Sequence, residues 1–259
     1  MRTQTLLIAA AAALAAAVTS SQAQTVYSAN VVGYVNVTFP ANSFSLIANQ
    51  LDTGSNTVNN VLNNGFLSGS AGGSESVMLI WTGHTFEVFD YYNAADASPD
   101  PAGWYDANSG LYCTNTLNPS QSVFIQNPSS GAITCTLTGQ VDQGTNTWST
   151  VIPGFGFYSE PTALAGVSLD NTNVNFPATS TQDTVQFWTG TGYGTAAGTG
   201  DALQYYDAAD ASPSPAGWYD VGTGNYESGN PAYWPNVGAG FLIFHGGGSS
   251  NWVQSFEVQ

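Results

Sequence analysis

Short apolar and aromatic runs alternate with polar turn residues along most of the chain. In the first half, the runs rich in β-branched and aromatic residues are Val31 to Val37, Phe44 to Ala48, Val77 to Trp81, Phe86 to Tyr92, Ser122 to Gln126 and Ala132 to Val141. Clusters of Gly, Asn, Pro and Ser separate these runs, which predicts short β-strands. Residues 82–84 indicate a tight hairpin, and Thr57 to Leu62 is the single helical piece that we expect.

The same pattern occurs a second time further along the chain. Residues 91–106 read YYNAADASPDPAGWYD and residues 205–220 read YYDAADASPSPAGWYD, so only two positions differ. A repeat of this kind outweighs local propensity as evidence of organisation. We therefore predict an all-β fold with two tandem homologous β-sandwich or small-barrel units, at residues 24–141 and 142–259.

The N-terminus has the parts of a secretory signal. Arg2 supplies a positive charge, residues 6–18 form an unbroken apolar run, and Ser21-Gln22-Ala23 places small residues where a signal peptidase cuts. The apolar run is too short to span roughly 30 Å of hydrocarbon as a helix, and no later stretch is long enough. We expect residues 1–23 to be a cleaved signal peptide, and the protein to be secreted or held at the cell surface.

The charge of the chain excludes several functions. Arg2 is its only Lys or Arg, so the exported protein keeps 17 acidic residues and no permanent cation. Nucleic-acid backbones are held by Lys and Arg, and both P-loop nucleotide binding and Schiff-base chemistry need a Lys. The acidity suits divalent cations or neutral partners. Aromatic residues make up 13% of the chain, which provides the core that a disordered protein lacks.

The sequence contains two cysteines, Cys113 and Cys135. In the oxidising environment of a secreted protein, an even pair indicates a disulfide. Two free buried thiols are the alternative. We predict the bridge.

Residues 31–51 read VVGYVNVTFPANSFSLIANQL, and Trp-Thr-Gly is followed downstream by Gly-Trp-Tyr-Asp and a Phe-Ile strand. Together these motifs resemble a group of secreted, internally duplicated β-proteins of environmental Gram-negative bacteria. The resemblance spans most of the chain after the signal peptide. It implies export and a small β-domain, but it implies no activity and carries over no catalytic residue.

The repeated segment is rich in side-chain oxygens, which suggests calcium binding. Hard cations such as Ca²⁺ take six to eight oxygen ligands, although the spacing matches no EF-hand. The alternative is a turn in which Asp and Pro act only through local geometry. The candidate calcium ligands are Asp96, Asp100, Asp106, Asp207, Asp210 and Asp220.

The same segment suggests a second hypothesis, carbohydrate binding. Exposed rings could stack on sugar faces while neighbouring carboxylates accept hydrogen bonds from hydroxyls, and two copies would make the protein bivalent. The alternative is that the rings anchor a core. The candidate ligand-binding residues are Trp104, Tyr105, Asp106, Trp218, Tyr219 and Asp220.

Catalysis has less support in the sequence. Two carboxylates suffice for a glycoside hydrolase, but the five Glu residues do not recur at matched positions, and no serine-hydrolase or zinc-protease motif is present. We expect a secreted, non-catalytic binding or structural protein of unknown ligand, with a polysaccharide, a cell-envelope component or further copies of itself as partner. A carbohydrate-binding module is the second hypothesis and a glycoside hydrolase the third.

Overall fold

The computed structural model describes residues 31–62, 65–67, 75–98, 100–179, 183–195, 202–212 and 214–257. The predicted signal peptide, residues 1–23, lies outside them. Strands dominate the described residues, and their helices are the short pieces α2 (Val58–Val61) and η1 (Pro231–Tyr233), which confirms the all-β prediction. No helix in this part of the chain is long and apolar enough to cross a membrane.

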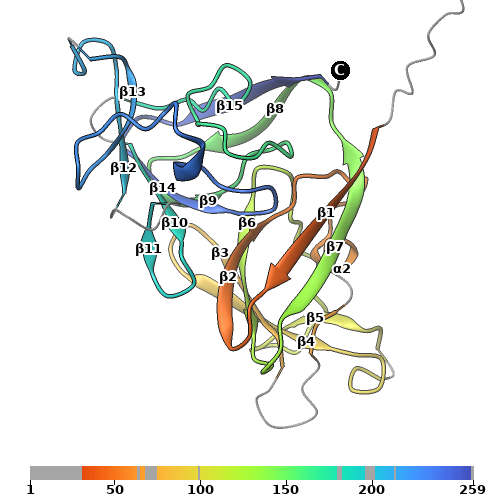
Figure 1. Ribbon diagram of the computed structural model, residues 1–259. Coiled ribbons are helices and arrows are strands. Elements are labelled where there is room, and N and C mark those ends of the chain that lie inside the picture. Colours follow the sequence, from red (N-terminus) through yellow and green to blue (C-terminus); the bar gives the residue numbers. More distant parts are fainter. Residues whose placement is uncertain are drawn as a thin grey trace, which may run out of the picture. The chain divides into compact units, whose positions relative to one another are not determined.

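The first half contains an antiparallel sheet in the order β2-β6-β3-β4-β5 and a separate two-stranded sheet, β1-β7 (Figure 1). The strands of the larger sheet are β2 (Ser43–Ala48), β6 (Ser122–Asn127), β3 (Val77–Trp81), β4 (Phe86–Tyr92) and β5 (Gly103–Asp106). The smaller sheet pairs β1 (Val31–Phe39) with β7 (Ile133–Val141) along their whole length. Alternate residues of β1 are buried, as expected of a strand with one face on a core.

The second half repeats this strand order. Its larger sheet runs β9-β14-β10-β12-β13, and its smaller sheet pairs β8 with β15. The strands are β8 (Gly144–Val151), β9 (Gly154–Tyr158), β10 (Thr184–Trp188), β12 (Leu203–Tyr206), β13 (Gly217–Asp220), β14 (Phe241–His245) and β15 (Ser250–Phe256). The short strand β11 (Tyr193–Gly194) forms a hairpin with β10 and corresponds to the start of β4, because Tyr193 lies opposite Trp188 as Phe86 lies opposite Trp81.

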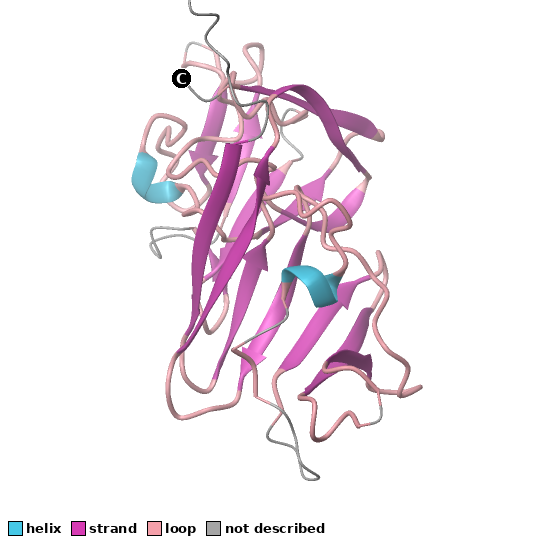
Figure 2. Cartoon of the chain, turned by 90° about the vertical axis from the view of Figure 1, so that its right-hand side faces the viewer, coloured by secondary structure: helices cyan, strands magenta, loops and turns pink. Residues whose placement is uncertain are grey.

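In each half, the two sheets contribute side chains to one buried core. In the first half, Val37 and Leu137 of the small sheet join Ile47, Met78 and Ile125 of the large sheet. In Figure 2 the β1–β7 pair crosses in front of the strands of the larger sheet. Within the described residues, none of the sheets closes on itself.

The halves contact each other through reciprocal pairs. The indole Nε1 of Trp81 donates to the carbonyl of Phe155 (3.3 Å), and that of Trp188 donates to the carbonyl of Phe44 (2.7 Å). Each pair joins the end of β3 or β10 in one half to the edge strand of the other half. Two further reciprocal pairings are Ile47 with Ala239 and Tyr158 with Gln121. Equivalent residues therefore exchange contacts, as in a twofold dimer.

Cys113 and Cys135 are both buried free thiols, so the predicted disulfide is not formed. Different sheets anchor the two residues. The backbone N–H of Cys113 donates to the carbonyl of Trp104 in β5 (2.8 Å), whereas Cys135 lies on β7 opposite Val37. Burial raises the pKa of both thiols above the ordinary value. They act as small apolar side chains of the core.

Candidate functional site

The repeated 16-residue segment connects two neighbouring strands in each half. In the first half it begins at the end of β4, where Tyr91 pairs with Trp104 of β5. In the second half it begins at the end of β12, where Tyr205 pairs with Trp218 of β13. Antiparallel pairing thus brings the ends of each segment together and holds the intervening residues as a loop at the edge of a sheet.

The first turn of each loop is fixed by a side-chain oxygen. The Oδ1 of Asn93 accepts from the backbone N–H groups of Ala95 (2.8 Å) and Asp96 (3.1 Å). In the second half, Asp207 Oδ1 accepts from the two equivalent N–H groups at 2.8 and 3.0 Å. An amide oxygen and a carboxylate oxygen both accept, so the Asn-to-Asp difference between the repeats preserves the turn.

The last residue of each repeat fixes a second turn. Asp106 Oδ1 accepts from the N–H of Asn108 (3.1 Å) and from both the N–H and the hydroxyl of Ser109 (2.6 and 2.7 Å). The hydrogen bond from the Ser109 hydroxyl, followed by those from the backbone, lowers the pKa of Asp106. Asp220 Oδ1 makes the equivalent bonds to the N–H groups of Gly222 and Thr223 (2.8 and 2.9 Å).

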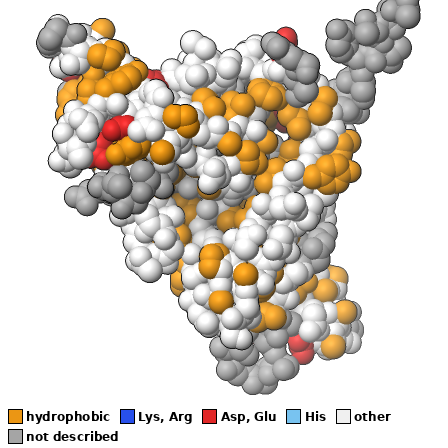
Figure 3. Space-filling model, viewed as in Figure 1, with side chains coloured by type: hydrophobic (Ala, Val, Ile, Leu, Met, Phe, Trp, Pro, Cys, Tyr) orange, Lys and Arg blue, Asp and Glu red, His pale blue; other side chains and the backbone are white. Residues whose placement is uncertain are grey.

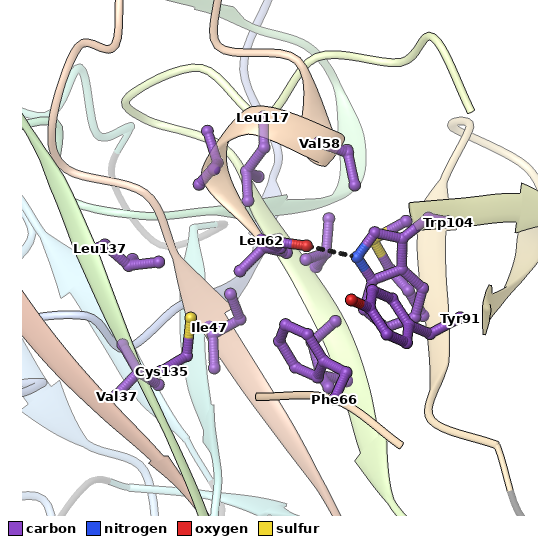
Figure 4. Close-up of a cluster of buried hydrophobic side chains, with 14 of the residues drawn as sticks. Val37, Ile47, Val58, Leu62, Phe66, Tyr91, Trp104, Leu117, Cys135 and Leu137 are labelled. Carbon is purple, nitrogen blue, oxygen red and sulfur yellow. Dashed lines mark hydrogen bonds between the residues drawn. The ribbon is translucent and has the colours of Figure 1, made fainter. Parts of the chain in front are cut away.

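The two repeated tryptophans are fully buried. Trp104 donates its indole N–H to the carbonyl of Leu62 (2.7 Å) and packs edge-on against Phe66 and Tyr91, as Figure 4 shows. Trp218 makes equivalent ring contacts with Tyr205 and Trp234. Because neither ring is exposed, neither can stack on a ligand in this structure. The tryptophans are core anchors, which the sequence had left as the alternative.

The repeated tyrosines lie next to each other in the loops. Tyr92 and Tyr105 have ring centroids 5.6 Å apart at an interplanar angle of 79°, and Tyr206 and Tyr219 are 5.4 Å apart at 85°. The hydroxyls of Tyr105 and Tyr219 donate to the carbonyls of Pro101 and Pro215. Each tyrosine pair therefore has a fixed geometry.

Each loop encloses a pocket against the tyrosine pair and the second turn. The first pocket has a volume of about 250 Å³ and is lined by Tyr92, Asp96, Ala97, Tyr105, Asp106, Ala107 and Gly110. The second pocket has a volume of about 320 Å³ and is lined by Tyr206, Asp210, Ala211, Tyr219, Asp220, Val221 and Gly224, together with Gln204 and Ser214. Every residue of the first pocket has its counterpart in the second, 114 positions further along.

The surroundings of the first pocket are the more acidic. Where the second pocket has Gln204 and Ser214, the first half has Asp90 and Asp100. Burial, followed by the charge of Asp90, raises the pKa of Tyr92. Burial and then the charge of Asp100 raise that of Tyr105. Figure 3 shows acidic side chains near β12 and β13, so the second pocket also lies in a negative region.

One carboxylate oxygen in the second pocket lacks a partner. Asp220 is fully buried, and its Oδ2 makes no hydrogen bond within the described part of the chain. An unpaired buried carboxylate oxygen is energetically costly. Because this oxygen is buried, a ligand in the pocket cannot contact it in this structure.

The structure thus brings together part of each predicted site. Tyr105, Asp106, Tyr219 and Asp220 line the pockets, whereas the tryptophans do not. Of the proposed calcium ligands, Asp96, Asp106, Asp210 and Asp220 line the pockets, while Asp100 and Asp207 do not. No group of three or more His, Cys, Asp or Glu side chains among the described residues is placed to hold a metal ion, and calcium binding stays a prediction.

The tyrosine that precedes each turn, Tyr92 or Tyr206, was not among the predicted ligand-binding residues. The signal was present in the sequence, because a Tyr-Tyr pair opens both repeats. Strand alternation explains the choice between the two tyrosines. The first of each pair faces the buried tryptophan, so the second faces the pocket.

Comparisons with protein-family models, with curated proteins and with solved structures gave no match to this chain. The resemblance to secreted duplicated β-proteins therefore stays a hypothesis. The functional argument depends on the pockets themselves.

Proposed function

We propose that this is a secreted, non-catalytic binding protein whose two pockets each take one sugar unit of a neutral carbohydrate. The observation that carries the proposal is the match between the pockets, because all seven positions of the first have counterparts that line the second. A structural turn needs the Asn or Asp at its start, the Asp at its end and the prolines. It does not need a second tyrosine, Tyr92 or Tyr206, that lines a pocket.

The chemistry of the pockets favours a neutral polyol. Tyrosine rings supply apolar surface, and the carboxylates of the exposed residues Asp96 and Asp210 can accept hydrogen bonds from hydroxyls. Anionic ligands are disfavoured because the exported chain carries no Lys or Arg. Volumes of about 250 and 320 Å³ lie at or below the lower end of the usual range for ligand pockets, which suits a single sugar unit.

The arrangement of the chain supports a bivalent role. We infer that the halves, residues 24–141 and 142–259, are tandem homologous sandwich units produced by duplication, since their sheets share one strand order. Two weak sites on one chain gain strength on a polymer, because the second binding event is intramolecular. Export through the signal at residues 1–23 would deliver the protein to extracellular or cell-surface polysaccharide.

Binding without hydrolysis is the reading we favour. A glycosidase needs one carboxyl to act as acid and a second to act as base or nucleophile. In these pockets, Asp106 and Asp220 each use Oδ1 to hold a turn. The pKa of Asp106 is lowered, which is the opposite of what an acid catalyst requires.

The test uses residues 24–259 on an array of neutral polysaccharides, with and without Ca²⁺. The variants are Tyr92→Ala, Tyr206→Ala and the double variant, and Leu111→Ala is the control, because Leu111 is 69% exposed and lies outside both pockets. We expect each single variant to weaken retention and the double variant to abolish it, with no sugar released. Full retention by a folded double variant would refute the proposal, and release of sugar would favour the hydrolase.

A further inference from the structure

A larger groove lies away from both pockets, on the outward face of β1 and β7. Its volume is about 640 Å³, and its lining includes Val32 and Tyr34 of β1, Thr138 and Gln140 of β7, and Asp52 and Asn60. Side chains of β1 and β7 form the floor, and residues Asp52 to Gly54 together with Asn60 of α2 form one wall. We call it the β1–β7 groove.

A pair of glycines on the inward face of the β1–β7 sheet allows the chain just before the wall, Leu51 and Asp52, to pack closely beneath it. Gly33 and Gly139 lie opposite each other in the β1–β7 register. A Cβ on Gly139 would lie 2.7 Å from the carbonyl oxygen of Asp52, and one on Gly33 would lie 2.5 Å from a methyl group of Leu51. Without side chains here, Asp52 and Gln140 exchange two backbone hydrogen bonds (2.9 and 2.8 Å). Backbone hydrogen bonds therefore hold the start of the wall against the edge of β7.

The floor of the groove presents an aromatic ring among uncommitted polar groups. Tyr34 is 72% exposed and Val32 is 58% exposed, which makes this a region of apolar surface open to solvent. The side chains of Tyr34, Thr138 and Gln140 make no hydrogen bond to any other described residue. Asn60 also lines the groove, but its Nδ2 already donates to the hydroxyl of Ser55 (2.5 Å). The side chains of Tyr34, Thr138 and Gln140 can donate to and accept from hydroxyls without breaking an internal bond.

We propose that the β1–β7 groove binds a run of several units of a neutral polysaccharide, with Tyr34 stacking against one sugar ring. The groove is open, and its volume is about twice that of the second pocket and about two and a half times that of the first. The carboxylate in its lining is that of Asp52, whose Oδ1 already accepts from Gly54 and Asn56. The groove therefore offers too few carboxylate oxygens to favour a metal ion. The ligand class rests on the proposed function, but the site is separate from the pockets.

The experiment measures binding of the protein, residues 24–259, to a neutral polysaccharide retained on the array and to its oligosaccharides of one to six units. The variants are Tyr34→Ala, Tyr34→Trp and Gln140→Ala, and Leu111→Ala is again the control. Tyr34→Ala should bind the six-unit ligand roughly tenfold more weakly and leave single-sugar binding unchanged. Tyr34→Trp should retain binding. Because Tyr34 is exposed, melting temperatures should not change.

The outcomes separate this inference from the proposed function. If the Tyr92→Ala, Tyr206→Ala double variant loses binding while Tyr34→Ala binds all lengths normally, binding in the groove is refuted and binding in the pockets is supported. If Tyr34→Ala weakens binding of long ligands and the double variant does not, binding in the groove is supported and binding in the pockets is refuted. If Tyr34→Ala weakens one-unit and six-unit ligands equally, or if neither variant changes binding, the groove is refuted.

Discussion

The two halves present the same seven residue positions to a pocket but support them differently. The backbone N–H of Trp104 donates to Asn59 Oδ1 (2.7 Å), whereas that of Trp218 donates to the hydroxyl of Ser228 (2.7 Å), which in turn donates to Asp170. The indole N–H of Trp104 has a partner, and that of Trp218 has none among the described residues. The ring positions and the pocket are kept while the residues behind them change.

The buried polar groups of the two halves differ as well. Where β10 and β14 of the second half bring together Asp183 and His245 (2.8 Å), the first half has Ser76 and Asn127. After β9 the second half has Glu160, and the equivalent position after β2 is Asn49. The first half thus satisfies these buried positions with neutral groups, and the second half uses ionisable ones.

The largest effect should come from truncating the repeated tryptophans. Trp104→Ala and Trp218→Ala each remove a fully buried ring and should lower the free energy of unfolding by about 3–5 kcal/mol. Substitution by Phe should affect the stability of the two halves differently. Trp104→Phe also loses a hydrogen bond worth about 1 kcal/mol, and Trp218→Phe does not. Urea unfolding measures both differences. Equal costs for the two Phe variants would contradict this account.

Asp183→Ala should destabilise the protein by about 3 kcal/mol or more, because it leaves the buried side chain of His245 without its hydrogen-bonded carboxylate. Asp183 also accepts from the backbone N–H groups of Thr179 and Gly246. The matched control is Ser76→Ala, which loses the weaker bond from the N–H of Leu67 (3.0 Å) and should cost about 1 kcal/mol. Thermal unfolding of both variants tests the difference, and a costlier Ser76→Ala would reverse the comparison.

Glu160→Asn should stabilise the protein at neutral pH by about 1–3 kcal/mol. Both carboxyl oxygens of Glu160 are buried without partners in the described structure, and burial raises the pKa of the carboxyl well above 4.5. The folded state therefore holds the acid neutral while the unfolded chain ionises it. The contribution of Glu160 to stability is present below pH 4.5 and is lost as the pH rises towards the folded pKa.

The pH dependence of melting temperature provides the measurement for Glu160. The stabilisation by Glu160→Asn should be small at pH 4 and large at pH 7 to 8. Asn49→Glu, the reciprocal change in the first half, should destabilise most at high pH, because Asn49 donates to the carbonyl of Leu117 and accepts from the N–H of Leu51. A stabilisation that does not vary with pH would show that Glu160 does not titrate between the two states.

The smallest effect should come from exchanging the charges around the pockets. Gln204→Asp with Ser214→Asp gives the second pocket the surroundings of the first, and Asp90→Gln with Asp100→Ser does the reverse. For a neutral sugar, each exchange should alter affinity by about threefold or less, because a ligand without charge interacts only weakly with a nearby carboxylate that it does not contact. Titration at low and at physiological salt measures the change. A much larger effect would identify a charged ligand.

Much of the local structure could be predicted because it depends on local pattern. Residues Val77 to Trp81 and Phe86 to Tyr92 form strands with the predicted bounds, and the helical piece after Thr57 is present as α2. The strand at Gly103–Asp106 has only four residues, and the pattern of apolar runs did not single it out. Its Trp104 is placed by contacts with Leu62 and Asn59, more than 40 positions away, which no local pattern reveals.

The site was predicted only in part, for a related reason. The repeat located the loops, but the composition of a loop does not tell which rings face inward. The pairing of Tyr91 with Trp104 decides that Tyr92 lines the pocket. The prediction of a disulfide was wrong because an even number of cysteines does not tell which sheet holds each one.

The reciprocal contacts between the halves have a consequence for how the protein can change. In a dimer of identical subunits, every substitution appears at both sites at once, so the sites cannot acquire different preferences. Here Trp81 meets Phe155 and Trp188 meets Phe44 within one chain, so the pairing survives while each half is encoded separately. Asp90 and Gln204 already differ at equivalent positions. Under the proposed function, one pocket of such a chain can keep its specificity while the other acquires a new ligand.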